Sequence, residues 1–180
     1  MSYPVFVKPE NGSASIDIHV ANTEEELRVI AGQIAAPMIQ EMMRGQEYGA
    51  DVYVDLISGK CISIFLKKKI KMRAGETDKA VSVHDEDAFR QIARFVEEAG
   101  FKGQLDMDLF YEDGEWVFSE VNPRYGGGYP HAQACGVNMP ALYLNNLAGK
   151  ENEARIGAYD DDIYMMKYNE IMIRAKEDLA

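Results

Sequence analysis

Four oxygen-bearing side chains flank a predicted β-turn in the second half of the chain. Asp106 and Asp108 precede the turn at Asp113-Gly114, and Glu120 and Asn122 follow it. Polar and apolar residues alternate on both sides of the turn, and Asp-Gly is a frequent hairpin turn, so the stretch predicts two antiparallel strands. Carboxylate and amide oxygens are the ligands that Mg²⁺ or Mn²⁺ prefers over zinc. The hairpin is therefore a candidate metal site.

The length of the turn decides which of these side chains share a face. A two-residue turn, Asp113-Gly114, pairs Asp108 with Ser119 and points Glu120 to the opposite face. A three-residue turn ending at Glu115 pairs Asp108 with Glu120, and a one-residue slip exchanges every side chain between faces. We favour the three-residue turn, which also sets Asp106 across from Asn122.

The alternative to a metal site is a solvated outer face, where most charged residues lie. With the three-residue turn, Phe110, Trp116 and Phe118 are expected on the same face as the carboxylates. Bulky aromatic neighbours would shield that face from water, and half-buried carboxylates need partners. This favours the metal site.

The motif in this hairpin resembles the metal- and phosphate-binding end of the ATP-grasp enzymes. The likeness consists of Asp108, the turn, Glu120-Val-Asn122-Pro-Arg124 and the glycines that follow. It is greatest to the large subunit of carbamoyl-phosphate synthase and its stand-alone relatives. The resemblance implies that Asp108, Glu120 and Asn122 hold Mg²⁺ ions that bridge the phosphates of ATP. It also implies that Arg124 contacts the transferred phosphoryl group or the acyl-phosphate intermediate.

Near the start of the chain, a lysine lies shortly before a loop of small residues. A short apolar strand ends at Lys8, and the loop that follows contains Gly12, Ser13 and Ser15. Taken alone, such a loop is usually a plain turn between strands. Beside the downstream motif it resembles the ATP-grasp lysine and its glycine-rich lid over the phosphates, although Asp17 stands where relatives usually have another glycine.

A second segment resembles the hinge between the two lobes of ATP-grasp enzymes. It is an apolar run followed by a polar turn, and on its own its methionines read as core residues. The resemblance implies that adenine meets the backbone at Glu41, Met42 and Met43. It also implies that Glu47 accepts hydrogen bonds from the ribose hydroxyls.

A run of basic residues interrupts an otherwise acidic chain. The stretches 51–56 and 61–66 alternate around a turn and predict a second hairpin, which leads into the basic run from Lys67 to Arg73. A charge run is usually a solvated face. The alternative is an electropositive lip for phosphates or a carboxylate substrate, with Lys69, Lys71 and Arg73 as candidates. Arg73 is preferred because a guanidinium binds these groups in a bidentate manner.

Composition limits the possible partners. The 180 residues carry a net charge of −11, with a pI near 4.7, which argues against nucleic acid binding. Two cysteines make no disulfide framework. The sequence contains no signal peptide and no apolar run of about 18 residues, so we expect a cytoplasmic protein without a membrane span. A homo-oligomer stays open.

The expected fold is α+β, a partial ATP-grasp fold whose two lobes have antiparallel sheets and flanking helices around a nucleotide cleft. Residues 1–43 form the small lid lobe and residues 44–180 the larger lobe. Thr23 to Glu26 is a capping box that opens one helix, and a second helix is expected over about 86–99. The resemblance implies that an N-terminal part of the enzyme precedes this stretch.

The implied activity is that of an ATP-dependent ligase. Its ligands would be ATP, Mg²⁺ or Mn²⁺, and a small carboxylate or bicarbonate. Phosphoryl transfer would give an acyl or carboxy phosphate, which an amine or ammonia then attacks. One alternative is an ATP-binding regulatory or catalytically incomplete module that lacks the N-terminal part. Another is a structural domain in which the acidic and basic groups only neutralise one another.

Overall fold

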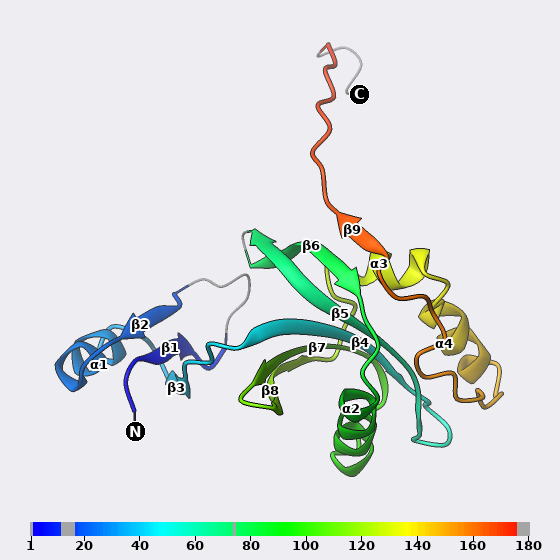
Figure 1. Ribbon diagram of the computed structural model, residues 1–180, viewed down its shortest axis with the longest axis horizontal. Helices are drawn as coiled ribbons and strands as arrows, with labels where there is room; N and C mark the ends of the chain where they lie inside the picture. Colours follow the sequence, from blue (N-terminus) through cyan, green and yellow to red (C-terminus); the bar gives the residue numbers. More distant parts are fainter. Residues whose placement is uncertain (1, 12–16, 74, 176–180) are drawn as a thin grey trace.

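The computed structural model describes residues 2–11, 17–73 and 75–175, which form two antiparallel sheets with helices around them (Figure 1). The smaller sheet has the strand order β2-β1-β3, and the larger has the order β8-β7-β4-β5-β6-β9. This agrees with the predicted α+β, partial ATP-grasp architecture. The elements are, in chain order, β1 (Val5–Pro9), β2 (His19–Ala21), α1 (Glu24–Ala31), β3 (Pro37–Glu41), β4 (Gln46–Val54), β5 (Cys61–Arg73), β6 (Glu76–Ser82), α2 (Glu86–Glu98), β7 (Gly103–Glu112), β8 (Glu115–Asn122), α3 (Tyr129–Ala134), α4 (Met139–Leu147) and β9 (Tyr164–Met166).

Helices cover one face of the large sheet and only one end of the other. On one face, α2 packs Phe89, Ile92 and Val96 against alternate residues of the central strands. On the other face, α3 and α4 cover only one end, where Tyr53 of β4 and Phe65 of β5 join their core. No helix of the described residues covers the rest of this second face, which points toward the small sheet (Figure 1).

The helices begin where the sequence predicts them. Thr23 caps α1 by accepting a hydrogen bond from the Glu26 backbone N–H at 3.2 Å, while the Glu26 carboxylate accepts from Asn22 N at 2.7 Å. Asp85 caps α2 in the same manner, through the N–H of Ala88. No helix in the described ranges combines the length and the apolar character needed to cross a membrane.

The hairpin of β7 and β8, here called the metal hairpin because it carries the candidate metal ligands, has the predicted pairing but not the predicted turn. Asp108 pairs with Glu120, as expected, and Asp106 pairs with Asn122. The turn, however, is the two-residue one, because Glu112 pairs directly with Glu115 and both intervening residues have positive φ, 52° and 87°. Paired positive φ angles match the twist of the strands in such turns. The three-residue turn was therefore wrong.

A β-bulge reconciles the short turn with the observed pairing. Leu109 pairs with Phe118, and the register then shifts so that Ser119 is the extra residue before Glu120. The shift also corrects the predicted aromatic face. Trp116 and Phe118 pack in the core beside α2, and only Phe110 lies on the carboxylate side.

Deleting Ser119 is expected to leave the metal hairpin intact. Without the extra residue, the strand after the two-residue turn reaches Glu120 in register with Asp108, so the pairing needs no bulge. We expect a cost of about 1 kcal/mol, measured by urea unfolding, with S119A as the control that keeps the bulge. A deletion that unfolds the chain would show that the bulge itself, and not only the pairing, is required.

Candidate functional site

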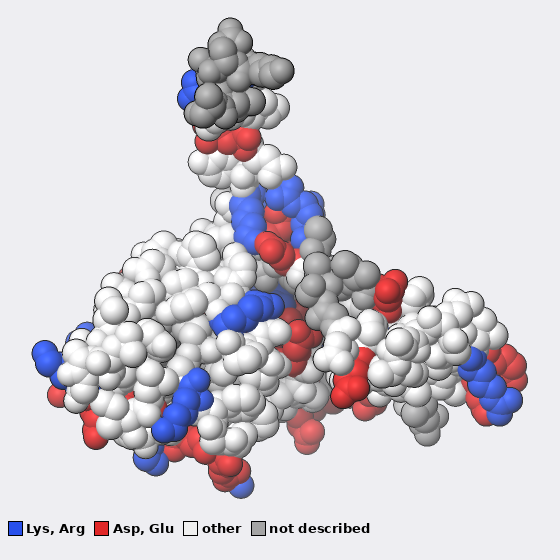
Figure 2. Space-filling model, turned by 180° about the vertical axis from the view of Figure 1, so that it is seen from behind, with Lys and Arg blue, Asp and Glu red and all other residues white. Residues whose placement is uncertain are grey.

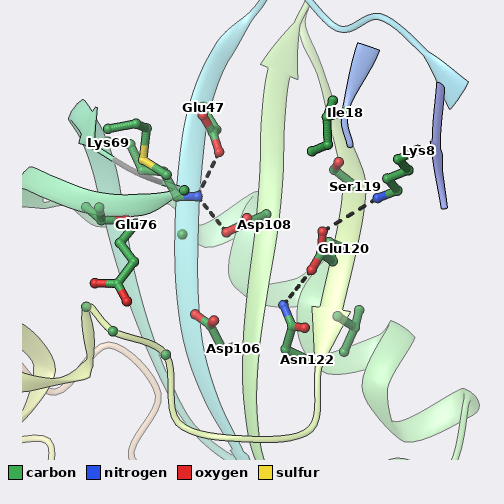
Figure 3. Close-up of a pocket in the computed structure, with 18 of the residues that line it drawn as sticks. Lys8, Ile18, Glu47, Lys69, Glu76, Asp106, Asp108, Ser119, Glu120 and Asn122 are labelled. Carbon is green, nitrogen blue, oxygen red and sulfur yellow. Dashed lines mark hydrogen bonds and ion pairs between the residues drawn. The ribbon is translucent and has the colours of Figure 1, made fainter. Parts of the chain in front are cut away.

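A cavity of about 1080 Å³ lies between the small sheet and the uncovered face of the large sheet (Figure 3). The small sheet contributes residues of β1 and β3, and the large sheet contributes residues of β4, β5, β6, β7 and β8. Seen from behind, basic and acidic side chains lie side by side in the hollow between the two parts (Figure 2). The charged residues that line it are Lys8, Glu10, Glu47, Lys67, Lys69, Glu76, Asp106, Asp108, Glu120 and Arg124.

The wall formed by the metal hairpin carries the predicted ligand set. Asp108 and Glu120 are partly exposed to the cavity, and the Asn122 amide donates to Glu120 Oε1 at 2.9 Å. In the described part of the chain, no three His, Cys, Asp or Glu side chains form a metal cage by themselves. Two carboxylates and one amide oxygen nevertheless fit Mg²⁺, which proteins usually hold through one or two carboxylates together with substrate phosphates.

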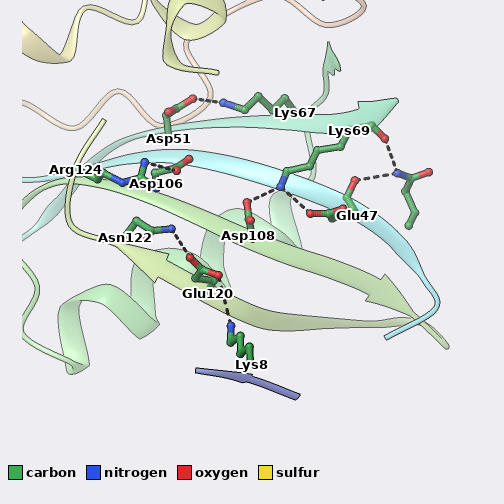
Figure 4. Close-up of polar contacts among 11 residues, drawn as sticks. Lys8, Glu47, Asp51, Lys67, Lys69, Asp106, Asp108, Glu120, Asn122 and Arg124 are labelled. Atoms are coloured by element: carbon green, nitrogen blue, oxygen red, sulfur yellow. Dashed lines mark hydrogen bonds and ion pairs between the residues drawn. The ribbon is translucent and has the colours of Figure 1, made fainter. Parts of the chain in front are cut away.

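Each carboxylate on this wall lies near a cation (Figure 4). Lys8 Nζ, from β1 of the small sheet, lies 3.6 Å from Glu120 Oε2. Lys69 Nζ lies 2.6 Å from Asp108 Oδ1, and Arg124 Nη1 lies 3.1 Å from Asp106 Oδ2. The site is therefore close to charge balance before any ligand binds.

Two pKa shifts follow from this arrangement. Burial raises the pKa of Asp106, and the nearby carboxylates of Asp51 and Asp108 add to the shift, against the opposing effects of Lys67 and Arg124. Burial alone would lower the pKa of Lys69, but the carboxylate of Asp108, and then that of Glu47, raise it above its ordinary value. Lys69 is therefore a firmly charged ammonium at neutral pH.

The floor of the cavity contains a second, fully buried ion pair. Lys67 Nζ lies 2.5 Å from Asp51 Oδ2, and at most 2% of either side chain is exposed. Asp51 Oδ1 has no hydrogen-bond partner among the described residues, and the same holds for Nδ1 of the buried His131. His131 Nε2 lies 2.9 Å from the Ile163 carbonyl, so this nitrogen carries the proton and Nδ1 is an acceptor.

The glycines after Arg124 are required by close contacts. A Cβ atom at Gly126 would overlap the carboxylate of Asp106, and one at Gly128 would lie 2.9 Å from Lys67 Nζ. The loop therefore lies so close to the charged floor that a side chain at Gly126 or Gly128 would have to displace the Asp106 carboxylate or the Lys67 ammonium.

The structure brings together most of the predicted site residues that it describes. Lys8, Glu47, Asp108, Glu120, Asn122 and Arg124 all line the cavity. Glu41, Met42 and Met43 lie at the hinge between β3 and β4 and are not among its lining residues; Met38 and Gln40 of β3 are. The predicted lid residues Gly12, Ser13 and Ser15 fall outside the described residues.

Arg73 lies outside the main cavity. It contributes to an adjoining hollow of about 300 Å³, where its Nη2 lies 3.1 Å from Asp78 Oδ1 and 3.4 Å from Asn169 Oδ1. The basic run is part of β5, whose register with β6 shifts between Lys69 and Lys71 and again between Lys71 and Met72. Lys67 and Lys69 point into the cavity and are buried, while Lys71 and Arg73 are exposed, so the run is not one uniform lip.

Among the charged residues of the cavity, Asp106 was placed on the metal face from the sequence but not assigned as a ligand, and Lys67 was assigned no role. Asp106 shares the parity of Asp108, which is the signal that placed it there. Lys67 gave no comparable signal, because its partner Asp51 lies on another strand and their pairing depends on the register.

Comparison with known proteins places this geometry in a family. Residues 33–171 match the family model described as ATP-grasp in the biosynthetic pathway with Ter operon. Among curated proteins, the chain is 31% identical over 169 residues to the vancomycin B-type resistance protein VanB of Enterococcus faecalis. The match covers 79% of this chain and 49% of VanB. It is 25% identical over 141 residues to a D-alanine–D-alanine ligase of Fusobacterium nucleatum, covering 69% of this chain and 47% of that ligase.

Solved structures share the fold at low identity. The biotin carboxylase domain of Hydrogenobacter thermophilus 2-oxoglutarate carboxylase, solved with MgADP and bicarbonate, has a TM-score of 0.70 at 16% identity. The match covers 91% of this chain and 40% of that one. The N5-carboxyaminoimidazole synthetase of Staphylococcus aureus, solved with ADP, has a TM-score of 0.68 at 14% identity, covering 84% and 43%. The chain spans about half the length of the curated relatives it matches, VanB and the D-alanine–D-alanine ligase. Because the family model matches well over half of its residues, the chain belongs to the ATP-grasp family.

Proposed function

We propose that this chain provides the nucleotide and metal site of an ATP- and Mg²⁺-dependent carboxylate–amine or ammonia ligase similar to carbamoyl-phosphate synthase. The observation that carries the proposal is the wall of the cavity. Asp108, Glu120 and Asn122 lie on one face of the hairpin, and Lys8 approaches them from the other sheet. A cavity of about 1080 Å³ has room for ATP and a small second substrate.

The two parts of the fold would divide the binding of ATP. Residues 1–43 act as a lid lobe, with Lys8 and the loop carrying Gly12, Ser13 and Ser15 over the phosphates. Adenine binds at the hinge, against the backbone of 41–43, and Glu47 accepts hydrogen bonds from the ribose. The position of Glu47 on the wall of the cavity, directly after the hinge, supports this role.

The metal ligands and the basic groups would serve phosphoryl transfer. Asp108, Glu120 and Asn122 hold Mg²⁺, which neutralises charge on the phosphates when it is bound. The γ-phosphoryl group passes from ATP to an oxygen of the carboxylate or bicarbonate, and ADP leaves. The amine or ammonia then forms a bond to the carbonyl carbon and displaces phosphate. Arg124 stabilises the transferred group, and the work of the protein is positioning and electrostatics.

Arg73 would act on the acceptor substrate. Arg73 lines the adjoining hollow together with Glu76, which also lines the main cavity. A carboxylate that replaces Asp78 as its partner gains a bidentate contact. The acceptor class, a small carboxylate or bicarbonate, is supported by the ligase named among the relatives and by the bicarbonate in the biotin carboxylase structure.

The test is calorimetric titration of MgATP into the wild-type chain, E120Q and the control E115Q. Glu115 lies next to the turn of the same hairpin, so E115Q removes the same charge at a position away from the cavity. We expect E120Q to bind MgATP at least about tenfold more weakly, because it loses an anionic metal ligand, and E115Q to bind as the wild type does. Equal affinities in all three proteins would contradict the proposed metal site. Binding by none of them, with the fold intact, would contradict the proposed nucleotide site of this chain.

A further inference from the structure

We propose that Lys69 is an internal counter-ion that occupies the ribose and metal positions of the cavity until a nucleotide arrives. As a result, the site takes up a divalent metal together with nucleotide rather than metal alone. The inference rests on the proposed function, since it concerns the order in which the same site is filled.

The ammonium of Lys69 joins two groups with different proposed partners. Lys69 projects from β5, and its Nζ lies 2.7 Å from Glu47 Oε1 on β4 and 2.6 Å from Asp108 Oδ1 on β7 (Figure 3). Only 4% of its side chain is exposed, whereas Glu47 and Asp108 are each 30% exposed. One buried cation therefore holds the ribose acceptor and a metal ligand at once, and both carboxylates still open toward the cavity.

A divalent ion on its own meets a competitor at this position. To bind Asp108 it must share the carboxylate with an ammonium at contact distance, and the two cations repel each other in a poorly solvated site. If Lys69 withdraws instead, it becomes a buried charge without a partner, which is strongly unfavourable. Both routes weaken the binding of metal alone.

A nucleotide removes the conflict because it supplies new acceptors. Its phosphate oxygens accept hydrogen bonds from a displaced ammonium, and its ribose hydroxyls donate to Glu47.

The experiment measures Mn²⁺ binding by the loss of its free-ion EPR signal, with and without a non-hydrolysable ATP analogue. The variants are K69M, the charge-retaining K69R and the control K68M, whose side chain lies on the opposite face of β5. We expect K69M to bind Mn²⁺ alone at least about tenfold more tightly than the wild type, and the analogue with Mg²⁺ at least about tenfold more weakly. K69R and K68M should bind Mn²⁺ as the wild type does.

The two expected changes in affinity have opposite signs, tighter for Mn²⁺ alone and weaker for the analogue. They distinguish a counter-ion from a residue that only supports the fold, because a loosened fold would weaken the binding of both ligands. Wild-type affinity of K69M for Mn²⁺ alone overturns the proposal. If the wild type binds no nucleotide, the proposed function fails, and so does the proposal that nucleotide displaces Lys69. A gain of Mn²⁺ affinity in K69M would then show only that Lys69 competes with the metal.

A second measurement does not depend on the folding of K69M. The ammonium of a buried lysine gives a resolved ¹H–¹⁵N signal, which is assigned to Lys69 by its absence from K69R. In the wild type we expect this signal to move when the analogue and Mg²⁺ are added together, and to stay when the same concentration of Mg²⁺ is added alone. A shift caused by Mg²⁺ alone overturns the proposal.

Discussion

Lys67→Met is expected to lower the free energy of unfolding by about 3–5 kcal/mol. The substitution removes one partner of the ion pair at the floor of the cavity, where the side chains of Lys67 and Asp51 are 2% and 0% exposed. Asp51 would be left as a buried carboxylate, and its Oδ1 already has no hydrogen-bond partner in the described part of the chain. Neighbouring Asp106, whose pKa burial and Asp51 already raise, would lose an opposing charge as well. Urea unfolding of the wild type and K67M measures the loss.

A double variant distinguishes the lost pair from lost packing. Asp51→Leu combined with K67M replaces both charges by apolar side chains, and such replacements are often neutral or stabilising. We expect the double variant to recover most of the stability that K67M loses, while K68M on the opposite face of β5 stays within about 0.5 kcal/mol of the wild type. If K67M is no less stable than K68M, the pair does not contribute as argued.

The metal hairpin shows what the alternation of residues can and cannot predict. The pattern identified both strands, because period-2 alternation and an Asp-Gly turn are local signals. The pairing of Asp108 with Glu120 was predicted through the three-residue turn, and it holds because the bulge offsets the shorter turn. It could not reveal the bulge at Ser119, since an extra residue in one strand is invisible unless the partner's register is known. The correct pairing therefore came with a wrong turn and with Trp116 and Phe118 on the wrong face.

The basic run shows a second limit. Five cations within seven residues read as one solvated or functional surface, yet β5 sends Lys67 and Lys69 inward and exposes Lys71 and Arg73. Strand alternation does not predict this difference, because the four residues lie two apart and would share a face in a regular strand. The register of β5 with β6 shifts between Lys69 and Lys71 and again between Lys71 and Met72, and such irregularities are not visible in one strand alone. What decides burial is the presence of Asp51 and Asp108 on neighbouring strands, and this depends on the order β7-β4-β5, which is a tertiary property.

The candidate site could be predicted mainly through its motif. Lys8, Glu47 and the ligands of the hairpin are far apart in the sequence, and no periodicity joins β1 to β8. Their resemblance to ATP-grasp enzymes supplied the expectation, and the structure places them around one cavity. The position of Arg73 in an adjoining hollow had no local signal, because it depends on β6 and on the chain near Lys167.

Gly45→Ala is the second substitution with a large expected effect, because it acts on the hinge between the sheets. Gly45 lies between β3 and β4, and its N–H and that of Arg44 donate to Glu112 Oε2 at 3.1 and 2.9 Å. A Cβ atom there would overlap the Tyr111 carbonyl oxygen and lie 2.7 Å from the Glu112 Cβ. Relief requires movement of the main chain of the hinge or of β7. We expect a loss of about 3 kcal/mol in unfolding free energy, the upper end of ordinary overpacking.

The hinge substitution should also weaken MgATP binding in the fraction that stays folded. The hydrogen bonds from the Arg44 and Gly45 N–H groups to Glu112 fix the hinge against the end of the metal hairpin. They therefore help to set the position of the small sheet, and with it the distance from Lys8 to Glu120. Calorimetry at a temperature where G45A is folded should show at least about tenfold weaker binding, because misplacement by about 1 Å has large effects on a bound transition-state or phosphate geometry. G32A is the control, since Gly32 has an ordinary helical φ of −69° and a Cβ there comes no closer than 3.3 Å to its neighbours. Unchanged affinity in a destabilised G45A would mean that the hinge supports the fold without setting the position of the small sheet over the metal face.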